Sequence, residues 1–277
     1  MGAPNKGIDD DGRMNSDTDR LVSIAAGVTP ELFSDPAAFI AAAAEAQWPA
    51  TGVWYEPESW TPQTTTEVRR RLDDTGLIAV DMEVVRMGPK GDVGMELIDA
   101  AAAVGAGNIL TISTFDDPAE TASRLADLCA HAAPAGIRVC IEFMRFTSVK
   151  TLADAIEVVT LADQPNAGIL VDLIHVFRSG TTYDDIRAAD PALFPYAQWC
   201  DGAAEPRGWE TRDLIIDAVD DRSIPGEGGL DALAFSDLFA PEVPLSLEIR
   251  SKALREAFPD PVVRAAHVLS KTLVALP

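Results

Sequence analysis

The sequence has 277 residues, a length that suits one large domain, and 47% of them are hydrophobic, as is usual for a globular protein. Acidic residues outnumber basic ones by 44 to 22, and the formal net charge is −22. Such a surface repels phosphate backbones and anionic membranes, so we expect neither nucleic acid nor a membrane as a partner. Three cysteines without a CxxC pair give no disulfide framework, and three histidines are too few for a histidine-rich zinc site.

The first twenty residues, 1–20, predict a disordered lead-in to one domain that spans residues 21–277. They carry charges but no apolar stretch of the kind that a secretory signal needs. The sequence also has no run of eighteen apolar residues that could form a transmembrane helix. We therefore expect a cytoplasmic protein.

Eight short runs of apolar and β-branched residues recur along the sequence, and most begin roughly thirty residues apart. The runs are LVSIAAG from Leu21, TGVWYEP from Thr51, LIAVDMEVV from Leu77, NILTIST from Asn108, IRVCIEF from Ile137, AGILVDLIH from Ala167, YAQWCDG from Tyr196 and PLSLEIR from Pro244. Strands that are buried on both faces read as continuous apolar runs, so each run predicts a strand of a parallel sheet.

Helix signals fill the segments between these runs. Ser34-Asp35-Pro36 predicts a helix start, because a polar cap precedes a proline in the first turn. The segment Thr64 to Leu72 is amphipathic, and Thr75-Gly76 stops it before the third run. The last helix is predicted over 259–276, with a buried stripe of Val263, Ala266, Val268 and Leu269.

Eight strand–helix alternations predict a single-domain (β/α)8 TIM barrel in the α/β class. An open doubly wound sheet is the rival, but it would need a glycine-rich phosphate loop after the first strand. The segment LVSIAAGVTPELF has one glycine and no GxGxxG, which favours the barrel. The long connection 201–242 would lie on the C-terminal rim, where barrels build their active sites.

Oxygen-bearing side chains stand near the ends of four consecutive predicted strands: Glu142, Asp172, Gln198 and Glu248. Each follows apolar positions that should be buried, and a lone buried carboxylate costs several kcal/mol unless it is paired or bound to a metal. Pairing with a neighbouring loop would explain any one of them alone. Three carboxylates and an amide together favour a hard divalent ion such as Mn²⁺ or Mg²⁺.

The motifs IEF at Glu142, DLIH at Asp172 and His175, RSIPGEGGLD at Arg222 and SLEI at Glu248 resemble the sugar phosphate isomerase/epimerase family. These proteins are xylose-isomerase-like TIM barrels that include ketose 3-epimerases and inosose dehydratases. The resemblance extends from the first strand to the last helix and is most specific from 141 to 250.

The resemblance implies one metal ion held by Glu142, Asp172, Gln198 and Glu248. Gln198 departs from the family pattern, because the ketose epimerases typically have histidine there. It also implies that His175 and Arg222 contact the substrate. The alternatives from the residues alone are a structural hydrogen bond for His175 and a surface pair with Asp220 or Asp221 for Arg222.

Other residues on the predicted rim are weaker candidates. Trp54 ends the second strand and could stack on a sugar or simply cap the barrel, and Glu83 is expected at the end of the third strand. Arg145 could hold an anionic group or form a salt bridge. Cys200 is expected to pack rather than act as a nucleophile, because no histidine is placed to activate it.

The expected chemistry is proton transfer next to a carbonyl group. A metal that chelates a carbonyl and an adjacent hydroxyl acidifies the α C–H and stabilises an enediolate. Glu142 and Glu248, on opposite sides of the site, are the predicted acid/base pair. The leading hypothesis is a metal-dependent isomerase or epimerase of a small sugar or cyclitol-like hydroxy ketone, with a homodimer possible in this family.

Two alternatives remain open at this level. Loss of a β-hydroxyl at the same site would make the chain a lyase of the inosose or dehydroshikimate dehydratase type. A non-catalytic sugar-binding barrel is the other alternative, and Gln198 is the feature that favours it. A phosphodiesterase of the AP endonuclease type would need several metals, more histidines and a basic face.

Overall fold

The structure is a computed structural model that describes residues 20–276. The predicted disordered lead-in therefore lies outside the described residues, with the exception of Arg20. Arg20 is part of the folded unit, because its guanidinium donates a hydrogen bond to the carbonyl oxygen of Phe239 at 2.7 Å.

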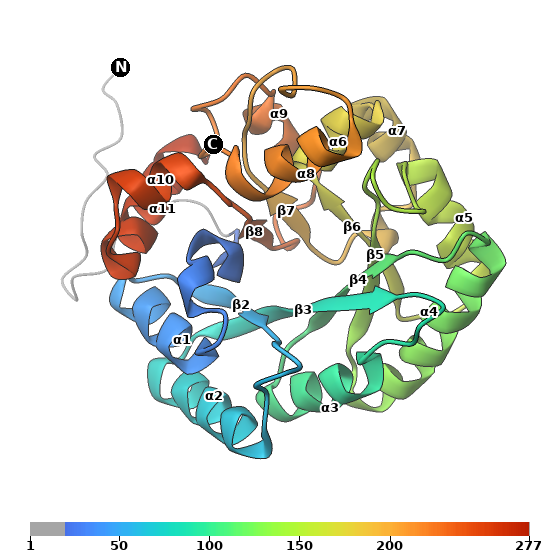
Figure 1. Ribbon diagram of the computed structural model, residues 1–277, viewed down its shortest axis with the longest axis horizontal. Coiled ribbons are helices and arrows are strands. Elements are labelled where there is room, and N and C mark those ends of the chain that lie inside the picture. The colour runs from blue at the N-terminus through green and yellow to red at the C-terminus, as the bar shows by residue number, and fades with distance from the viewer. Residues whose placement is uncertain (1–19, 277) are drawn as a thin grey trace.

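Eight parallel strands close into a barrel in the order β1 to β8, and β8 pairs with β1 (Figure 1). The strands are β1 (Val22–Ile24), β2 (Ala50–Trp54), β3 (Ile78–Met87), β4 (Asn108–Ser113), β5 (Arg138–Glu142), β6 (Ala167–Asp172), β7 (Ala197–Trp199) and β8 (Leu245–Leu247). The predicted (β/α)8 TIM barrel is thus confirmed.

Helices surround the barrel on its outer side (Figure 1). The principal helices are α1 (Pro36–Glu45), α2 (Pro62–Thr75), α3 (Gly94–Val104), α4 (Pro118–Ala132), α5 (Leu152–Ala162), α6 (Leu173–Ser179), α8 (Thr211–Asp220) and α11 (Pro261–Ala275). Short helices complete the set: α7 (Tyr183–Ala188), α9 (Ala232–Ser236), α10 (Lys252–Ala257) and the 3₁₀ turns η1 (Ala26–Val28), η2 (Pro30–Leu32), η3 (Ala133–Ala135) and η4 (Pro191–Leu193). Within residues 20–276, none of the helices combines the length and the apolar character that a membrane crossing requires.

The local signals in the sequence explain where these helices begin and end. Asp35 caps α1, since its side chain accepts a hydrogen bond from the backbone N–H of Ala38. Thr61 and Thr64 form a reciprocal capping box at the start of α2. Gly76 ends the same helix with φ 73°, a left-handed conformation that favours glycine.

Two sequence-based expectations about these elements are wrong. The third strand continues to Met87, so Glu83 lies within β3 and not at its end. In α11, Val268 and Leu269 are buried as expected, but Val263 is 52% exposed and Ala266 is also exposed. Periodicity fixes the angular spacing of residues on a helix, but it leaves the width of the buried stripe open.

The core has two parts, on either side of the strands. The larger part packs strand residues such as Val53 and Ile109 against helix residues such as Leu97 and Leu125. The smaller part fills the barrel interior, and its residues come from β2 to β6 and from the position before β7: Ala50, Val80, Val84, Leu110, Cys140, Leu170 and Tyr196. Toward the C-terminal ends of the strands, polar residues follow these inward-facing apolar ones. The barrel interior therefore leads directly to the candidate site.

Candidate active site

Four predicted ligands lie on neighbouring strands at the C-terminal end of the barrel. Glu142 and Asp172 are the last residues of β5 and β6, Gln198 is the middle residue of β7, and Glu248 directly follows β8. Asp172 and Gln198 are direct partners in the register of β6 and β7. All four are at most 5% exposed, so each polar group needs a partner inside the protein or in a bound group.

Glu142, Asp172 and His175 form the tightest group in this region. Each offers one ligand atom within 4.8 Å of the others, and all three residues are buried. Asp172 caps α6, because its Oδ1 accepts a hydrogen bond from the backbone N–H of Ile174 at 3.0 Å. This cap places His175 in the first turn of α6, with Nε2 at 3.8 Å from Oε1 of Glu142.

Burial controls the protonation of this group. It raises the pKa of Glu142 well above its ordinary value, and the negative charge of Asp172 raises it further, against the opposing charges of Arg222 and Arg250. Burial also raises the pKa of Glu248. The same desolvation lowers the pKa of His175 to about 4, so the imidazole is neutral at pH 7 and its contact with Glu142 is not an ion pair.

Arg222 is buried and reaches the proposed ligand Asp172. Its Nη1 donates to Oδ2 of Asp172 at 2.6 Å, and its Nε donates to the carbonyl oxygen of Ala218 at 2.6 Å. The alternative partners Asp220 and Asp221 pair with other arginines. Arg222 therefore belongs to the interior of the site and not to the surface of the loop.

The residues present fit a divalent cation. Oε2 of Glu248 is buried without a hydrogen-bond partner among the described residues, so this acceptor is free to face a cation. Glu142 and Glu248 have pKa values raised by burial, and Asp172 lies close enough to raise both further. A nearby positive charge would relieve this repulsion, and carboxylate and amide oxygens suit a hard ion. Glu248 is not part of the tight group, and its Oε1 lies beside Gly27.

The weaker rim candidates have different environments. Trp54 stacks on Phe33 with ring centroids 4.0 Å apart, so one face of its indole is already covered. Glu83 is buried, its Oε1 has no hydrogen-bond partner in residues 20–276, and burial raises its pKa. Arg145 lies over the ring of Trp209 at 5.1 Å and makes no ion pair with any described residue. Cys200 is buried with a raised pKa, which agrees with a packing role.

Sequence reasoning missed two charged residues next to this site. Asp81 on β3 is fully buried, neither carboxylate oxygen has a described partner, and burial raises its pKa to about 7. Its signal was present in LIAVDMEVV, where an acidic residue interrupts an apolar run. Arg250 follows Glu248 by two residues, and its charge lowers the pKa of Glu83, Glu142 and Glu248 against the effect of burial.

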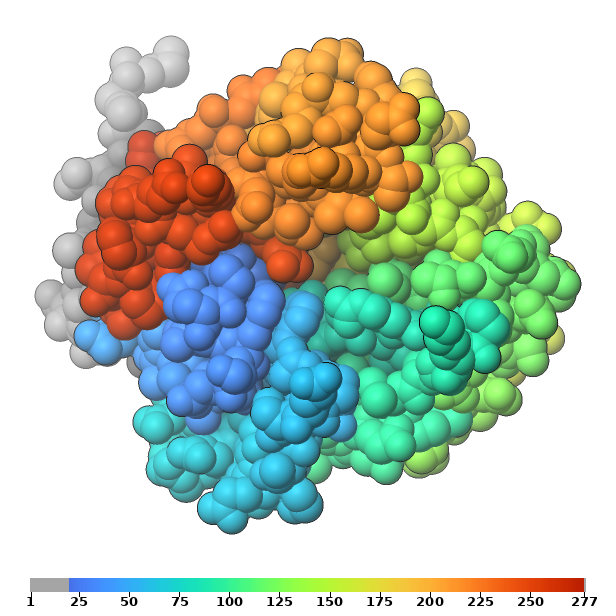
Figure 2. All heavy atoms as spheres, in the orientation of Figure 1, coloured from blue at the N-terminus to red at the C-terminus, as the bar shows by residue number. Residues whose placement is uncertain are grey.

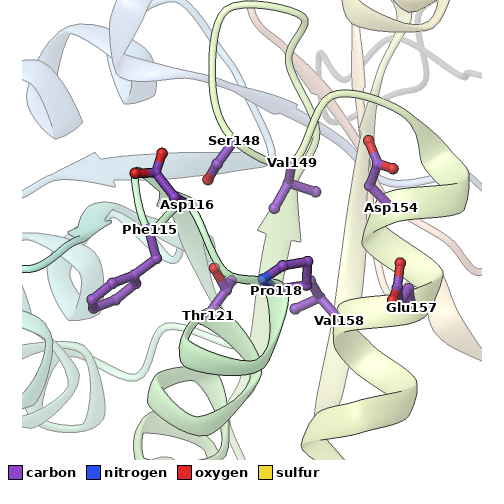
Figure 3. A pocket seen from close by; sticks show the side chains of 9 residues that line it. All are labelled: Phe115, Asp116, Pro118, Thr121, Ser148, Val149, Asp154, Glu157 and Val158. Carbon is purple, nitrogen blue, oxygen red and sulfur yellow. The ribbon is translucent and has the colours of Figure 1, made fainter.

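The face that carries the site is hollowed near its centre, between the orange segment 201–231 and the pale-blue segment 55–61 (Figure 2). A separate pocket lies further out, where the segments after β4 and β5 meet α4 and α5 (Figure 3). Asp116, Asp154 and Glu157 line that pocket together with apolar groups, and it shares no residue with the carboxylate site. The site therefore lies in the barrel mouth and not in this lateral pocket.

Comparison with known proteins agrees with this architecture. An inosose isomerase from Bacillus licheniformis is 25% identical over 162 residues. The match covers 54% of this chain and 55% of that protein, so the chain spans about half the length of this relative. The likeness is therefore confined to about half of each protein.

Several solved structures share the fold at low sequence identity. The IOLI protein with a bound zinc atom has a TM-score of 0.75 and 15% identity, covering 92% of this chain and 96% of that one. A D-allulose 3-epimerase from Methylomonas sp. has a TM-score of 0.64 and 16% identity, covering 93% and 98%. The probable 3-DHS dehydratase AsbF from Bacillus anthracis has a TM-score of 0.63 and 16% identity, covering 90% and 98%. At these identities the likeness is one of fold.

The family comparison covers most of the chain. The model of the xylose isomerase-like TIM barrel matches residues 40–259, a range that includes β2 to β8 and every residue of the tight group. The chain therefore belongs to the xylose isomerase-like TIM barrel family.

Proposed function

We propose that the chain is a divalent-metal-dependent isomerase or epimerase of a small sugar or cyclitol-like hydroxy ketone. The observation that carries this proposal is the buried group of Glu142, Asp172 and His175 at the ends of β5 and β6. The family assignment and the likeness to an inosose isomerase support the class of substrate.

The proposed metal ligands are Glu142, Asp172, Gln198 and Glu248. Their donors are oxygens only, which favours Mn²⁺ or Mg²⁺ over softer ions. When bound, the cation would supply Lewis-acid polarisation of the substrate carbonyl, which acidifies the adjacent C–H. Gln198 would contribute a neutral oxygen, so the four proposed ligands carry three negative charges when ionised. Arg222 already balances the charge of one of them, Asp172.

Glu142 and Glu248 are the proposed proton carriers. They stand on β5 and just after β8, so they reach a substrate in the barrel mouth from different directions. One carboxylate removes the proton next to the carbonyl, which leaves an enediolate of the substrate, and the other returns a proton. Return to the same carbon gives an epimer, and return to the neighbouring carbon gives an isomer.

His175 and Arg222 have supporting roles in this proposal. The imidazole of His175 is neutral at pH 7, so it can donate an N–H to a substrate oxygen without adding charge. Arg222 orients Asp172 through its short hydrogen bond and presents its remaining donors toward the substrate oxygens. Trp54, Glu83 and Arg145 are proposed to shape the rim around them.

Dehydration is the second candidate reaction. If the β-hydroxyl group leaves after the same proton removal, the reaction is a dehydration and the enzyme is a lyase. The fold shared with a probable 3-DHS dehydratase supports keeping this alternative. A barrel that binds sugars without catalysis is the third candidate, and the amide at Gln198 is the observation that favours it.

Hydrogen exchange at the α-carbon tests the proposal. Ketoses and inososes are incubated in D₂O with Mn²⁺, and deuterium incorporation is followed by NMR. We expect incorporation with at least one compound, and we expect Glu142→Gln and Glu248→Gln to reduce its rate by about a hundredfold or more. The matched control is Glu205→Gln, an exposed glutamate of the segment after β7, which should keep the parental rate.

The outcomes separate the three candidates. Exchange without a new chromophore supports the isomerase or epimerase, whereas an enone absorbance supports the dehydratase. Binding of a sugar with no exchange and no effect of Mn²⁺ would leave the non-catalytic barrel and contradict the proposal.

A further inference from the structure

Four side chains form a continuous stack across the rim where the barrel closes. The guanidinium of Arg86 lies 6.0 Å from the ring centre of Trp54, Trp54 stacks on Phe33 at 4.0 Å, and Arg250 lies 5.6 Å from the ring centre of Phe33. The stack, Arg86–Trp54–Phe33–Arg250, joins β3, β2, the segment after β1 and the segment after β8. Two cations therefore flank one aromatic pair.

The two arginines of the stack lie near carboxylates without a direct contact to one among the described residues. Burial lowers the pKa of Arg86 and the charges of Glu83 and Glu56 raise it, while the charge of Arg250 lowers the pKa of Glu83 and Glu248 against the effect of burial. The buried arginines Arg178 and Arg222 pair with aspartates. Arg86 is exposed and Arg250 is half-buried. Neither Arg86 nor Arg250 forms an ion pair within the part of the chain that the structure describes. The Nε of Arg250 is buried and has no hydrogen-bond partner there. A buried donor of this kind is costly unless something else accepts its hydrogen bond.

The stack borders the carboxylate site directly. Trp54 is the register partner of Glu83 in β2 and β3. Arg250 and Glu248 pack together over Gly27, where an added Cβ would lie 2.5 Å from Oε1 of Glu248 and 2.6 Å from Cγ of Arg250. Glycine at position 27 therefore allows both side chains to approach the backbone.

We propose that Arg86 and Arg250 form a subsite for an anionic group, a carboxylate or a phosphate, on the hydroxy ketone substrate. Guanidinium groups present planar, paired donors that match such oxyanions, and the aromatic pair holds them in place. The rest of the molecule, with a net charge of −22, repels anions, so this stack gives the site a local preference for one. The identity of the substrate rests on the proposed function, but recognition of the anion depends on the two arginines alone.

The competing explanation is that both arginines only offset the charges of Glu83 and Glu248. Calorimetric titration with three probes separates the two explanations: D-fructose, D-fructose 6-phosphate and 5-keto-D-gluconate. They are a neutral ketose, a phosphorylated ketose and a ketose acid. Each is titrated at low salt into the full chain, once with Mn²⁺ and once with EDTA. The variants are Arg86→Gln, Arg250→Gln and Arg250→Lys, and the control is Arg212→Gln, an exposed arginine of α8 without an ion pair in the described residues.

We expect at least one anionic probe to bind about tenfold more tightly than D-fructose, the gain typical of one charge-assisted hydrogen bond. Arg86→Gln and Arg250→Gln should each abolish this preference, Arg212→Gln should keep it, and rising salt should weaken it. Arg250→Lys keeps the charge but loses the planar donors, so it should retain only part of the preference. Circular dichroism and the melting temperature of each variant check that it is folded. The ranking of the two anionic probes shows whether a phosphate or a carboxylate is preferred.

Equal affinity for all three probes, no measurable binding of the anionic probes, or a preference that survives both glutamine variants would overturn the inference. The EDTA titrations keep this test separate from the proposed function. A preference that persists without metal, in a protein that shows no deuterium exchange, would contradict the proposed reaction and leave the anion subsite standing. Exchange on neutral ketoses, combined with equal affinity for all three probes, would support the proposed reaction and overturn the anion subsite.

Discussion

Arg222 and Asp172 form a buried ion pair next to the proposed metal ligands. Their side chains are 4% and 0% exposed, and the pair is also bonded to backbone groups at Ala218 and Ile174. Such pairs contribute little net stability, but removal of one partner leaves an uncompensated buried charge. The guanidinium of Arg222 thus offsets the charge of Asp172, a task that a bound cation would share.

The first prediction concerns this pair. Arg222→Met should lower the free energy of unfolding of the metal-free protein by roughly 3–5 kcal/mol, because Asp172 then loses its only basic partner among residues 20–276. Addition of Mn²⁺ should restore part of the loss. Denaturant unfolding with and without EDTA measures both effects. The control Arg207→Met removes an exposed pair with Asp221 and should cost about 1 kcal/mol or less. Equal losses in the two variants would contradict this account.

The second prediction concerns Asp81. Burial, reinforced by the charge of Glu248, raises its pKa from 3.8 to about 7, so the folded state keeps a proton that the unfolded chain has released. The unfolded state therefore binds fewer protons between these pH values, and stability falls as the pH rises from 3.8 to 7. Asp81→Asn should melt at a higher temperature than the parent protein at pH 8, whereas below pH 3.8 the two should melt together.

Melting of the metal-free proteins across this pH range measures the difference. Asp116→Asn, at an exposed position after β4, controls for the loss of one negative charge. If Asp81→Asn and Asp116→Asn respond to pH in the same way, Asp81 does not hold its proton in the folded state.

At the scale of elements, the segment 201–231 is organised by one buried carboxylate. Oδ1 of Asp201 accepts hydrogen bonds from the backbone N–H groups of Gly202 and Leu230, and Oδ2 accepts one from Gly226. Backbone bonds between Asp201 and Ser223 close the same segment. Because Arg222 directly precedes this bridge, Asp201 sets the position from which Arg222 reaches Asp172.

The third prediction follows from this arrangement. Asp201→Ala should destabilise the protein by roughly 1–3 kcal/mol, since three backbone donors lose their acceptor. In this variant, hydrogen exchange in 223–231 should become faster than in the parent protein. Exchange in β5 and β6 should not change, because these strands keep their own hydrogen bonds. Glu205→Ala, at an exposed position of the same segment, serves as the matched control. Unchanged exchange in 223–231 would show that other contacts hold the segment.

The sequence predicted the elements well where burial alone decides them. All eight apolar runs overlap strands, and the caps at Asp35 and Gly76 mark the ends of α1 and α2. The end of β3 was not predicted, because the polar Arg86 occupies a strand position at the rim. The exposure of Val263 was missed for a related reason, since an apolar residue at helical spacing can lie at the edge of the contact surface.

The site was predictable as far as it depends on strand order. The closed barrel sets Glu142, Asp172, Gln198 and Glu248 at one end of four adjacent strands, as the apolar residues before them implied. The pair of Arg222 with Asp172 was not predictable, because it joins residues fifty positions apart through an irregular segment. The stack of Arg86, Trp54, Phe33 and Arg250 likewise depends on the closure of β8 onto β1.

At the scale of the whole molecule, the account depends on whether the acidic barrel binds one cation at its mouth. Titration of the metal-free protein with Mn²⁺, followed by electron paramagnetic resonance of the free ion, measures this directly. The account predicts one site per chain, with affinity reduced about tenfold or more by Glu142→Gln or Glu248→Gln and unchanged by Glu205→Gln. No saturable site, or a site whose affinity is the same in all three variants, would contradict it.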